Sequence, residues 1–314
     1  MATNARPSGA LDAPEAWPSL PFSSWQDSGA TLQRWLQIVG KVRMALSPPQ
    51  NHWWHVVFFV TSRGLTTSLI PAGNRTFEAE FDFCQHNLLL RANDGMEKFL
   101  ALYPRSVADF YRELMGALSA MGIEARISPK PDEVADRIPF AEDRVHGAYD
   151  SDFVHRFWRA LVTVDCLLKE FRSGFVGKCS PVHFFWGGMD MAVTRFSGRP
   201  APVREGMDPV DREAYSHEVI SAGFWPGDPQ LSSPAFYAYA RPEPRGLADS
   251  TVRPKQAFYN RQMSLFCLPY EDARAASSPS EAVREFLQST YEAAAKLGAW
   301  DRAALERSWG VDVR

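Results

Sequence analysis

The chain has 314 residues, of which 45% are hydrophobic and 23% charged, a composition typical of a soluble globular protein with one large domain or two ordinary ones. A formal net charge of −3, with no run of Lys and Arg, argues against a nucleic-acid partner, which needs a basic surface to neutralise phosphates. No apolar run approaches the roughly 20 residues of a membrane span, so we expect no membrane partner either.

Residues 1–16 lack the apolar core of a signal peptide and are predicted to form a disordered N-terminal tail. The four cysteines lie far apart and form no Cys-x-x-Cys pair. Free thiols in a reducing compartment are the simplest interpretation, so we expect a cytoplasmic protein.

Helical stretches with one apolar face alternate with groups of short strands, which predicts an α+β fold. In residues 17–128 the pattern predicts two helices and six strands: helices over 30–46 and 106–121, and strands near 56–61, 65–70, 76–83, 88–91, 98–102 and 124–127. Asn93-Asp94-Gly95 is a hairpin signal between the fourth and fifth of these strands.

Residues 129–150 are rich in Pro and acidic residues and are predicted to be a connector. The remainder, 151–314, repeats the order of helix, strands and helix. The predicted helices cover 151–168 and 280–297, and the predicted strands lie within 178–195, 214–224, 235–239 and 265–268. Two loops rich in Pro, Gly and Ser, 226–234 and 241–256, are expected to be irregular.

The two halves resemble each other, which predicts an internal duplication. The apolar positions of the helices at 30–46 and 151–168 match at a constant offset, and His55 and His183 each enter a strand of aromatic residues. Each half would be an antiparallel sheet flanked by two helices, and the halves would pack as one globular unit. Because all amphipathic helices share this spacing, the alternative is a similarity of helix faces alone. In a duplicated protein, the cleft between the halves is the natural place for a ligand.

One stretch concentrates reactive side chains: residues 178–195, with the sequence K-C-S-P-V-H-F-F-W-G-G-M-D-M-A-V-T-R. Gly187 and Gly188 interrupt what is otherwise a strand pattern. Glycine in a strand marks a bulge or the close approach of a backbone or ligand. We therefore expect a site here.

An acid–base site can be built from histidines and carboxylates of the second half. His183 or His217 would be the acid or base, Glu218 or Asp190 its orienting partner, and Arg195 an anchor for substrate. The pocket would have aromatic walls and be floored by strands 178–195 and 215–225. The residues predicted to bind the ligand are Lys178, Trp186, Arg195, Trp225, His55 and Trp54.

Three alternative sites remain open from the sequence. A metal could be held by His183, His217 and Glu218 with His55 or His146, although no HExxH motif supports one, so metal and cofactor stay undetermined. Cys179 could be a nucleophile, but in an extended strand His183 would be roughly 13 Å away, too far for proton transfer.

The third alternative is an anion site between arginines and tryptophans. Guanidinium groups bind carboxylate and phosphate well, and large rings form walls around a ligand. The candidate anchors are Arg195, Lys178, Arg43 and Arg63, and the candidate walls are Trp186, Trp225, Trp53 and Trp54.

Several long motifs of the chain resemble an uncharacterised bacterial family, domain of unknown function 5996. The motifs are N-H-W-W-H-V, T-S-R-G-L-T-T, Y-P-R-S-V-A-D-F-Y, G-K-C-S-P-V-H-F-F-W-G, D-M-A-V-T-R-F-S-G-R and Y-S-H-E-V-I-S-A-G-F-W-P-G. The resemblance covers nearly all of the chain after the tail. It implies a stand-alone bacterial protein and carries no activity, cofactor or catalytic residue.

From the sequence we expect an enzyme that acts on a small polar or anionic molecule. The alternatives are a non-catalytic protein that binds a small ligand, and a scaffold without a pocket. An enzyme requires a histidine and a carboxylate within hydrogen-bond reach in the pocket, whereas a binding protein requires only the walls.

Overall fold

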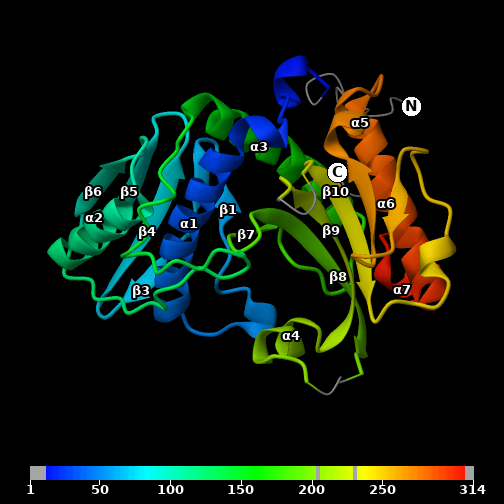
Figure 1. The fold of residues 1–314 in the computed structure, drawn as a ribbon. Coiled ribbons are helices and arrows are strands. Elements are labelled where there is room, and N and C mark those ends of the chain that lie inside the picture. The colour runs from blue at the N-terminus through cyan, green and yellow to red at the C-terminus, as the bar shows by residue number, and fades with distance from the viewer. Residues whose placement is uncertain (1–11, 203–205, 229–231, 308–314) are drawn as a thin grey trace, which may run out of the picture.

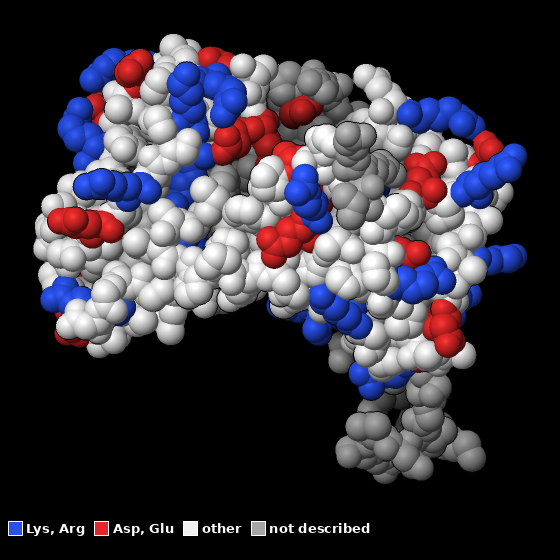
Figure 2. Space-filling model, turned by 90° about the horizontal axis from the view of Figure 1, so that it is seen from below, with Lys and Arg blue, Asp and Glu red and all other residues white. Residues whose placement is uncertain are grey.

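The computed structural model describes residues 12–202, 206–228 and 232–307, which form two antiparallel sheets with helices around them. The α+β fold class is confirmed. In Figure 1 the first sheet, with α1 and α2, forms one half of the molecule, and the second sheet, with α5, α6 and α7, forms the other half. Helix α3 lies between the two halves. Of the helices in the described part of the chain, none is both long enough and apolar enough to cross a membrane. On the face seen in Figure 2, basic side chains lie among acidic ones.

The first sheet has six strands in the order β1-β2-β4-β5-β6, with β3 also paired to β4. Alternation along β4 buries Phe77, Ala79 and Phe81, while the residues between them are partly exposed. Two helices accompany the sheet, and the Ser106 side chain caps the second by accepting from the Asp109 N–H at 3.1 Å. The elements are α1 (Phe22–Leu46), η3 (Asn51–Trp53), β1 (Phe59–Val60), β2 (Gly64–Thr66), β3 (Ile70–Ala72), β4 (Arg75–Asp82), β5 (Asn87–Ala92), β6 (Glu97–Ala101) and α2 (Val107–Ala120).

The second sheet has six strands in the order β11-β12-β10-β9-β8-β7. Helices α3, α5 and α6 pack against it. The strands are β7 (His183–Phe185), β8 (Asp190–Pro200), β9 (His217–Trp225), β10 (Ala235–Arg241), β11 (Phe258–Asn260) and β12 (Leu265–Pro269). The helices of this half are α3 (Ser151–Ser173), α4 (Pro209–Ala214), η4 (Leu247–Asp249), α5 (Tyr270–Arg274), α6 (Pro279–Leu297) and α7 (Arg302–Leu305).

The two sheets are joined by a backbone pair between Phe58 and Phe184. The N–H of each residue donates to the carbonyl of the other at 2.9 Å. Both side chains are fully buried: the Phe58 ring contacts Phe81 of the first sheet, and the Phe184 ring contacts Phe157 of α3. One continuous apolar core therefore runs through both halves, which accounts for their packing as a single unit.

Trp186, the residue directly after β7, packs this junction against α1. Its indole N–H donates to the Val56 carbonyl at 2.6 Å, and its ring lies over Gly40 of α1. A Cβ on Gly40 would stand 2.4 Å from the indole nitrogen. The glycine therefore lets the tryptophan seat directly on the helix backbone.

Several predicted boundaries differ from the structure. Residues 124–127 form no strand, because no neighbouring strand is there to pair with them, and α1 begins earlier than predicted, at Phe22. Residues 1–11 of the predicted tail lie outside the described residues. Asp12 is ordered, because its carboxylate accepts from the Ser280 N–H at 2.9 Å and from the Ser280 hydroxyl at 2.6 Å, at the start of α6.

The internal duplication stays a prediction. Both halves do run from a long helix through six strands to another helix. In the first sheet β1 lies at one edge and β6 at the other, whereas in the second sheet the last two strands, β11 and β12, lie next to β10 at one edge. The strand orders alone therefore do not establish a repeat.

Replacing Gly40 with Ala should lower the free energy of unfolding by roughly 1–3 kcal/mol, because the added methyl group overlaps the pinned Trp186 ring. Gly116→Ala in α2 is the matched control: nothing lies within 4 Å of its Cβ position, so helix propensity should raise stability by up to about 1 kcal/mol. Urea unfolding of both variants measures the difference. A Gly40→Ala protein as stable as the Gly116→Ala protein would contradict the packing.

Candidate functional site

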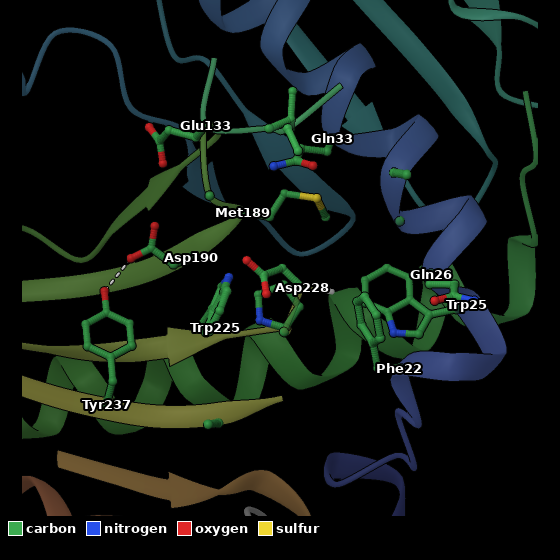
Figure 3. Close-up of a pocket in the computed structure, with 18 of the residues that line it drawn as sticks. Phe22, Trp25, Gln26, Gln33, Glu133, Met189, Asp190, Trp225, Asp228 and Tyr237 are labelled. Carbon is green, nitrogen blue, oxygen red and sulfur yellow. Dashed lines mark hydrogen bonds between the residues drawn. The ribbon is translucent and has the colours of Figure 1, made fainter. Parts of the chain in front are cut away.

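A pocket of about 680 Å³ lies between the two halves of the molecule. The N-terminal part of α1 and residues 133–136 form one side, and the second sheet forms the other (Figure 3). Glu133, Asp190 and Tyr237 lie at one end, Phe22 and Trp25 lie at the other, and further residues lie between them, among them Trp225, Met189 and Asp228. The pocket thus has a carboxyl end and an aromatic end.

The alternation of side chains along β10 supplies one wall. Phe236 and Ala238 point into the core, whereas Ala235, Tyr237 and Tyr239 line the pocket. The rings of Tyr237 and Tyr239 stack with their centroids 6.1 Å apart.

Gly223 on β9 allows Tyr237 to reach across the sheet. Tyr237 is paired with Gly223, and a Cβ on that glycine would stand 2.7 Å from the tyrosine oxygen. Without a side chain there, the Tyr237 hydroxyl passes over β9 and donates a hydrogen bond to the Asp190 carboxylate on β8. β9, the strand between β8 and β10, therefore needs a glycine at this position.

The double glycine forms the turn between β7 and β8, and a side chain approaches it closely. A Cβ on Gly187 would stand 2.1 Å from Glu133 Oε1. The corresponding point on Gly188 lies 3.3 Å from Glu133 Oε2 and 3.5 Å from Asp190 Oδ1. The glycines therefore make room for one carboxylate beside another.

The backbone is strained on both sides of this carboxyl pair. Glu133 has φ 54° and Met189, directly before Asp190, has φ 59°. A left-handed conformation costs a residue with a side chain roughly 1–2 kcal/mol, and such strain is concentrated at functional sites.

Burial and like charge keep a proton on this pair near neutral pH. Burial, with a smaller contribution from the charge of Glu133, raises the pKa of Asp190 to about 7, although the hydrogen bond from Tyr237 acts in the opposite direction. The pKa of Glu133 is raised too, by desolvation and by the charges of Asp132 and Asp211. Glu133 is open to the space of the pocket, yet no hydrogen bond or ion pair joins its carboxylate to another described residue.

Helix α1 holds the strained segments in place with amide side chains. The Gln37 amide N–H donates to the Asp132 carbonyl at 2.8 Å, and its oxygen accepts from the Asp132 N–H at 2.8 Å. Lys41 forms an ion pair with the Asp132 carboxylate. Gln33 donates to the Gly187 carbonyl at 2.5 Å. One helix therefore positions both the residue before Glu133 and the turn before Asp190.

His146, which lines the pocket, is paired with a buried carboxylate behind it. His146 Nδ1 lies 2.9 Å from Asp143 Oδ2, so Nδ1 carries the proton and Nε2 is left to accept one. Asp143 is fully buried, forms an ion pair with Arg34 at 3.3 Å, and accepts from the His146 N–H at 3.0 Å. The imidazole is therefore held in one orientation and tautomer.

Of the residues expected from the sequence for an acid–base site, Asp190 and Trp225 line this pocket, and His146, named as a possible metal ligand, lines it too. His183 is buried in β7 among the rings of Trp54, Phe59 and Phe185, with no hydrogen-bond partner for Nδ1 in the described structure. Burial, and then the charges of Arg43 and Arg172, lower its pKa to about 4. The His183 imidazole is therefore uncharged near neutral pH.

The other two catalytic candidates, His217 and Glu218, are the first two residues of β9. His217 Nδ1 is 3.1 Å from the Ser216 hydroxyl. Glu218 accepts from Arg199 at 2.6 Å and from Ser197 at 2.9 Å. Neither lines the pocket.

The predicted anchors are engaged elsewhere. Lys178 Nζ lies 2.7 Å from His52 Nε2 and sits over the Trp54 ring. His55 Nδ1 accepts from the Gln50 N–H at 3.2 Å, whereas Trp186 packs on α1.

Arg195 is buried among the Phe171, Phe175 and Tyr291 rings and donates to the Phe171 carbonyl. Burial raises the pKa of the neighbouring Cys179 thiol to about 11, which disfavours a thiolate. Among the described residues, no three His, Cys, Asp or Glu side chains are grouped as metal ligands.

Sequence reasoning missed Glu133 and the two tyrosines of β10, and it named His146 only as a possible metal ligand. The alternation A-F-Y-A-Y-A at 235–240 could have indicated a polar face on that strand. No comparable signal marks Glu133 or His146, because both lie in the segment predicted to be a connector.

A family model matches residues 17–307 and describes a family of unknown function, DUF5996. The chain belongs to the DUF5996 family. No curated protein and no solved structure is similar enough to be matched to it. For this DUF5996 protein, function is therefore inferred from the pocket.

Replacing Tyr237 with Phe should raise the pKa of Asp190 above about 7, because the lost hydroxyl stabilises the carboxylate form. Tyr239→Phe is the matched control, since that hydroxyl lies 3.1 Å from Tyr215 and not on Asp190. Carbon-13 NMR titration of the aspartate carboxyls follows both variants. An unchanged or lower pKa in Tyr237→Phe would contradict the assigned hydrogen bond.

Asp190→Asn should stabilise the protein at high pH. The folded pKa of about 7 lies above the ordinary aspartate value of 3.8, so the unfolded chain ionises first and stability falls as pH rises between these values. Removing the group should gain on the order of a few kcal/mol at pH 8, with the gain vanishing below pH 4. Thermal unfolding across pH measures it. Asp27→Asn, at an exposed position of the same pocket, should show no such trend.

Proposed function

We propose that this protein is an enzyme that transfers protons to and from a small polar molecule bound between its two halves. The observation that supports it best is the placement of Asp190, which lines the pocket beside Glu133 and accepts from Tyr237, where burial raises its pKa to about 7. A carboxyl group with a pKa near the working pH is suited to general acid catalysis.

The proposed acid and base come from different walls of the pocket. Asp190 would donate a proton, with Tyr237 fixing its orientation through the hydrogen bond to Oδ2. His146 would accept a proton at Nε2, with Asp143 holding the tautomer. The 2.9 Å contact between His146 and Asp143 supports His146, in place of His183 or His217, as the histidine of the proposed site.

The position of bound substrate follows from the two ends of the pocket. A ring or short chain would rest against Trp225 and Trp25, and its reacting group would face Asp190 and Glu133. The pocket volume of about 680 Å³ is that of a site for a small molecule.

We further propose that the protein works in the cytoplasm. The cysteines Cys84, Cys166, Cys179 and Cys267 are all free thiols, as expected in a reducing compartment.

The second candidate is a protein that binds the same molecule without converting it. The aromatic walls favour it, since they provide affinity without any acid or base. In that case Asp190 and Glu133 would recognise the ligand by hydrogen bonds and charge alone.

Turnover distinguishes the two. Purified protein is incubated with a panel of small amines, polyols, amino acids and organic acids, and mass spectrometry follows their consumption. Asp190→Asn and His146→Gln should each slow consumption by about 10²- to 10⁴-fold, and the wild-type rate should fall above about pH 7 as Asp190 loses its proton. His155→Gln on α3, outside the pocket, is the matched histidine control.

Two results would reject the catalytic proposal. One is binding of a panel compound with no product formed. The other is a loss of turnover in His217→Gln while His146→Gln remains fully active, which would place the acid–base group outside this pocket.

A further inference from the structure

The charges that line the pocket bear on the class of molecule it takes. The described lining residues include the carboxyl groups of Asp27, Glu133, Asp136 and Asp190. The basic residues that line it are Arg34 and His146.

Both basic residues are already held by one buried carboxylate outside the lining. Arg34 Nε lies 3.3 Å from Asp143 Oδ2, and His146 Nδ1 lies 2.9 Å from the same oxygen. Behind Glu133, Lys41 is bound to Asp132. The charges of Arg34 and Lys41 are therefore already paired within the protein, and an anionic ligand would meet an excess of negative charge.

Glu133 is placed to receive a partner from outside the chain. Its carboxylate lies against the Gly187–Gly188 turn and is exposed to the space of the pocket, and no described residue forms a hydrogen bond or ion pair with it. A bound cation would supply the charge partner that this carboxylate lacks within the described residues.

Aromatic rings complete the surroundings that a cation prefers. Trp225 lies beside the carboxyl end of the pocket, and Trp25 and Phe22 lie across from it (Figure 3). The faces of such rings attract ammonium groups, and this attraction adds to the charge of nearby carboxylates.

We propose that the ligand of this pocket is a small organic cation, an amine or a quaternary ammonium compound. Its nitrogen lies between Glu133 and Asp190, and its carbon atoms rest on Trp225. The inference rests on the pocket of the proposed function and names its substrate class.

Binding of a cation changes the protonation of the pocket in a known direction. The titratable groups around Asp190 are Glu133, Tyr237, Tyr215 and Tyr239, all of them acids. A positive charge placed among them favours the ionised carboxylates, so a cation expels the proton that the pair holds near pH 7. A neutral ligand leaves the protonation of the carboxyl pair unchanged, and an anion favours uptake of a further proton by the pair.

Three ligands of one shape test this inference by calorimetry: choline, the neutral 3,3-dimethylbutan-1-ol and the anionic 3,3-dimethylbutanoate. Choline has no ammonium proton to lose, so a buffer-dependent binding enthalpy at pH 7 reports the protein's own proton. We expect choline to bind at least tenfold more tightly than the alcohol, with release of a fraction of a proton. Benzyltrimethylammonium and putrescine extend the set to a larger and a divalent cation.

Glu133→Gln should weaken binding of the best cation by about tenfold or more, because the cation then loses one of the two carboxylates that flank its nitrogen. Glu142→Gln is the matched control, an exposed glutamate of the same segment that does not line the pocket. Asp190→Asn should abolish the proton release.

The inference is overturned if no cation of the set binds more tightly than the neutral alcohol, or if the anion binds best. A trimethyl-lysine peptide is a separate arm, and its binding in the absence of choline binding would overturn the assignment to a free small molecule. The calorimetry does not depend on turnover. A protein that binds choline and converts nothing rejects the catalytic proposal alone, whereas conversion of an anion rejects the cation alone.

Discussion

The backbone pair between Phe58 and Phe184 fixes where the walls of the pocket stand. It joins the edge of the first sheet to β7, and β7 leads directly into the turn beside Glu133. Trp186, two residues further on, seats this turn on α1 at Gly40. Because the junction lies inside a continuous apolar core, the helix of one half and the sheet of the other are held at a constant separation.

The carboxyl end of the pocket is energetically unfavourable by itself. It brings Glu133 and Asp190 together, raises the pKa of both, and places Glu133 and Met189 in left-handed backbone conformations. The contacts of Gln33, Gln37 and Lys41 with the flanking segments compensate for this, since all three come from successive turns of one well-packed helix. A rigid frame around an unstable pair of groups is characteristic of a functional site.

The sequence was sufficient for most of the secondary structure and for one region of the site. Helix faces and strand alternation predicted the long helices and most strands, and Gly187-Gly188 drew attention to the turn that the Glu133 side chain approaches closely. Asp190 and Trp225 were among the predicted residues because they flank predicted strands of that region. What the sequence could not supply were partners from elsewhere in the chain.

Glu133 and His146 illustrate the reason. Both come from a segment without helix or strand, so no periodicity gives the direction of their side chains. Their positions depend on contacts with α1, about a hundred residues earlier in the chain, such as the 2.8 Å hydrogen bonds between Gln37 and Asp132. His183 and Arg195 show the opposite case. Both lie on strands, as predicted, but their side chains are buried among aromatic rings and do not line the pocket.

The bare position at Gly223 has a consequence for the wider DUF5996 family. The tyrosine of β10 and the aspartate of β8 meet only because the strand between them carries no side chain there. A methyl group at that point would part them while every pocket-lining residue kept its identity. Position 223 is therefore a marker that can be read from sequence alone: relatives with Asp and Tyr at positions 190 and 237 share the coupled pair only where they also have glycine at 223.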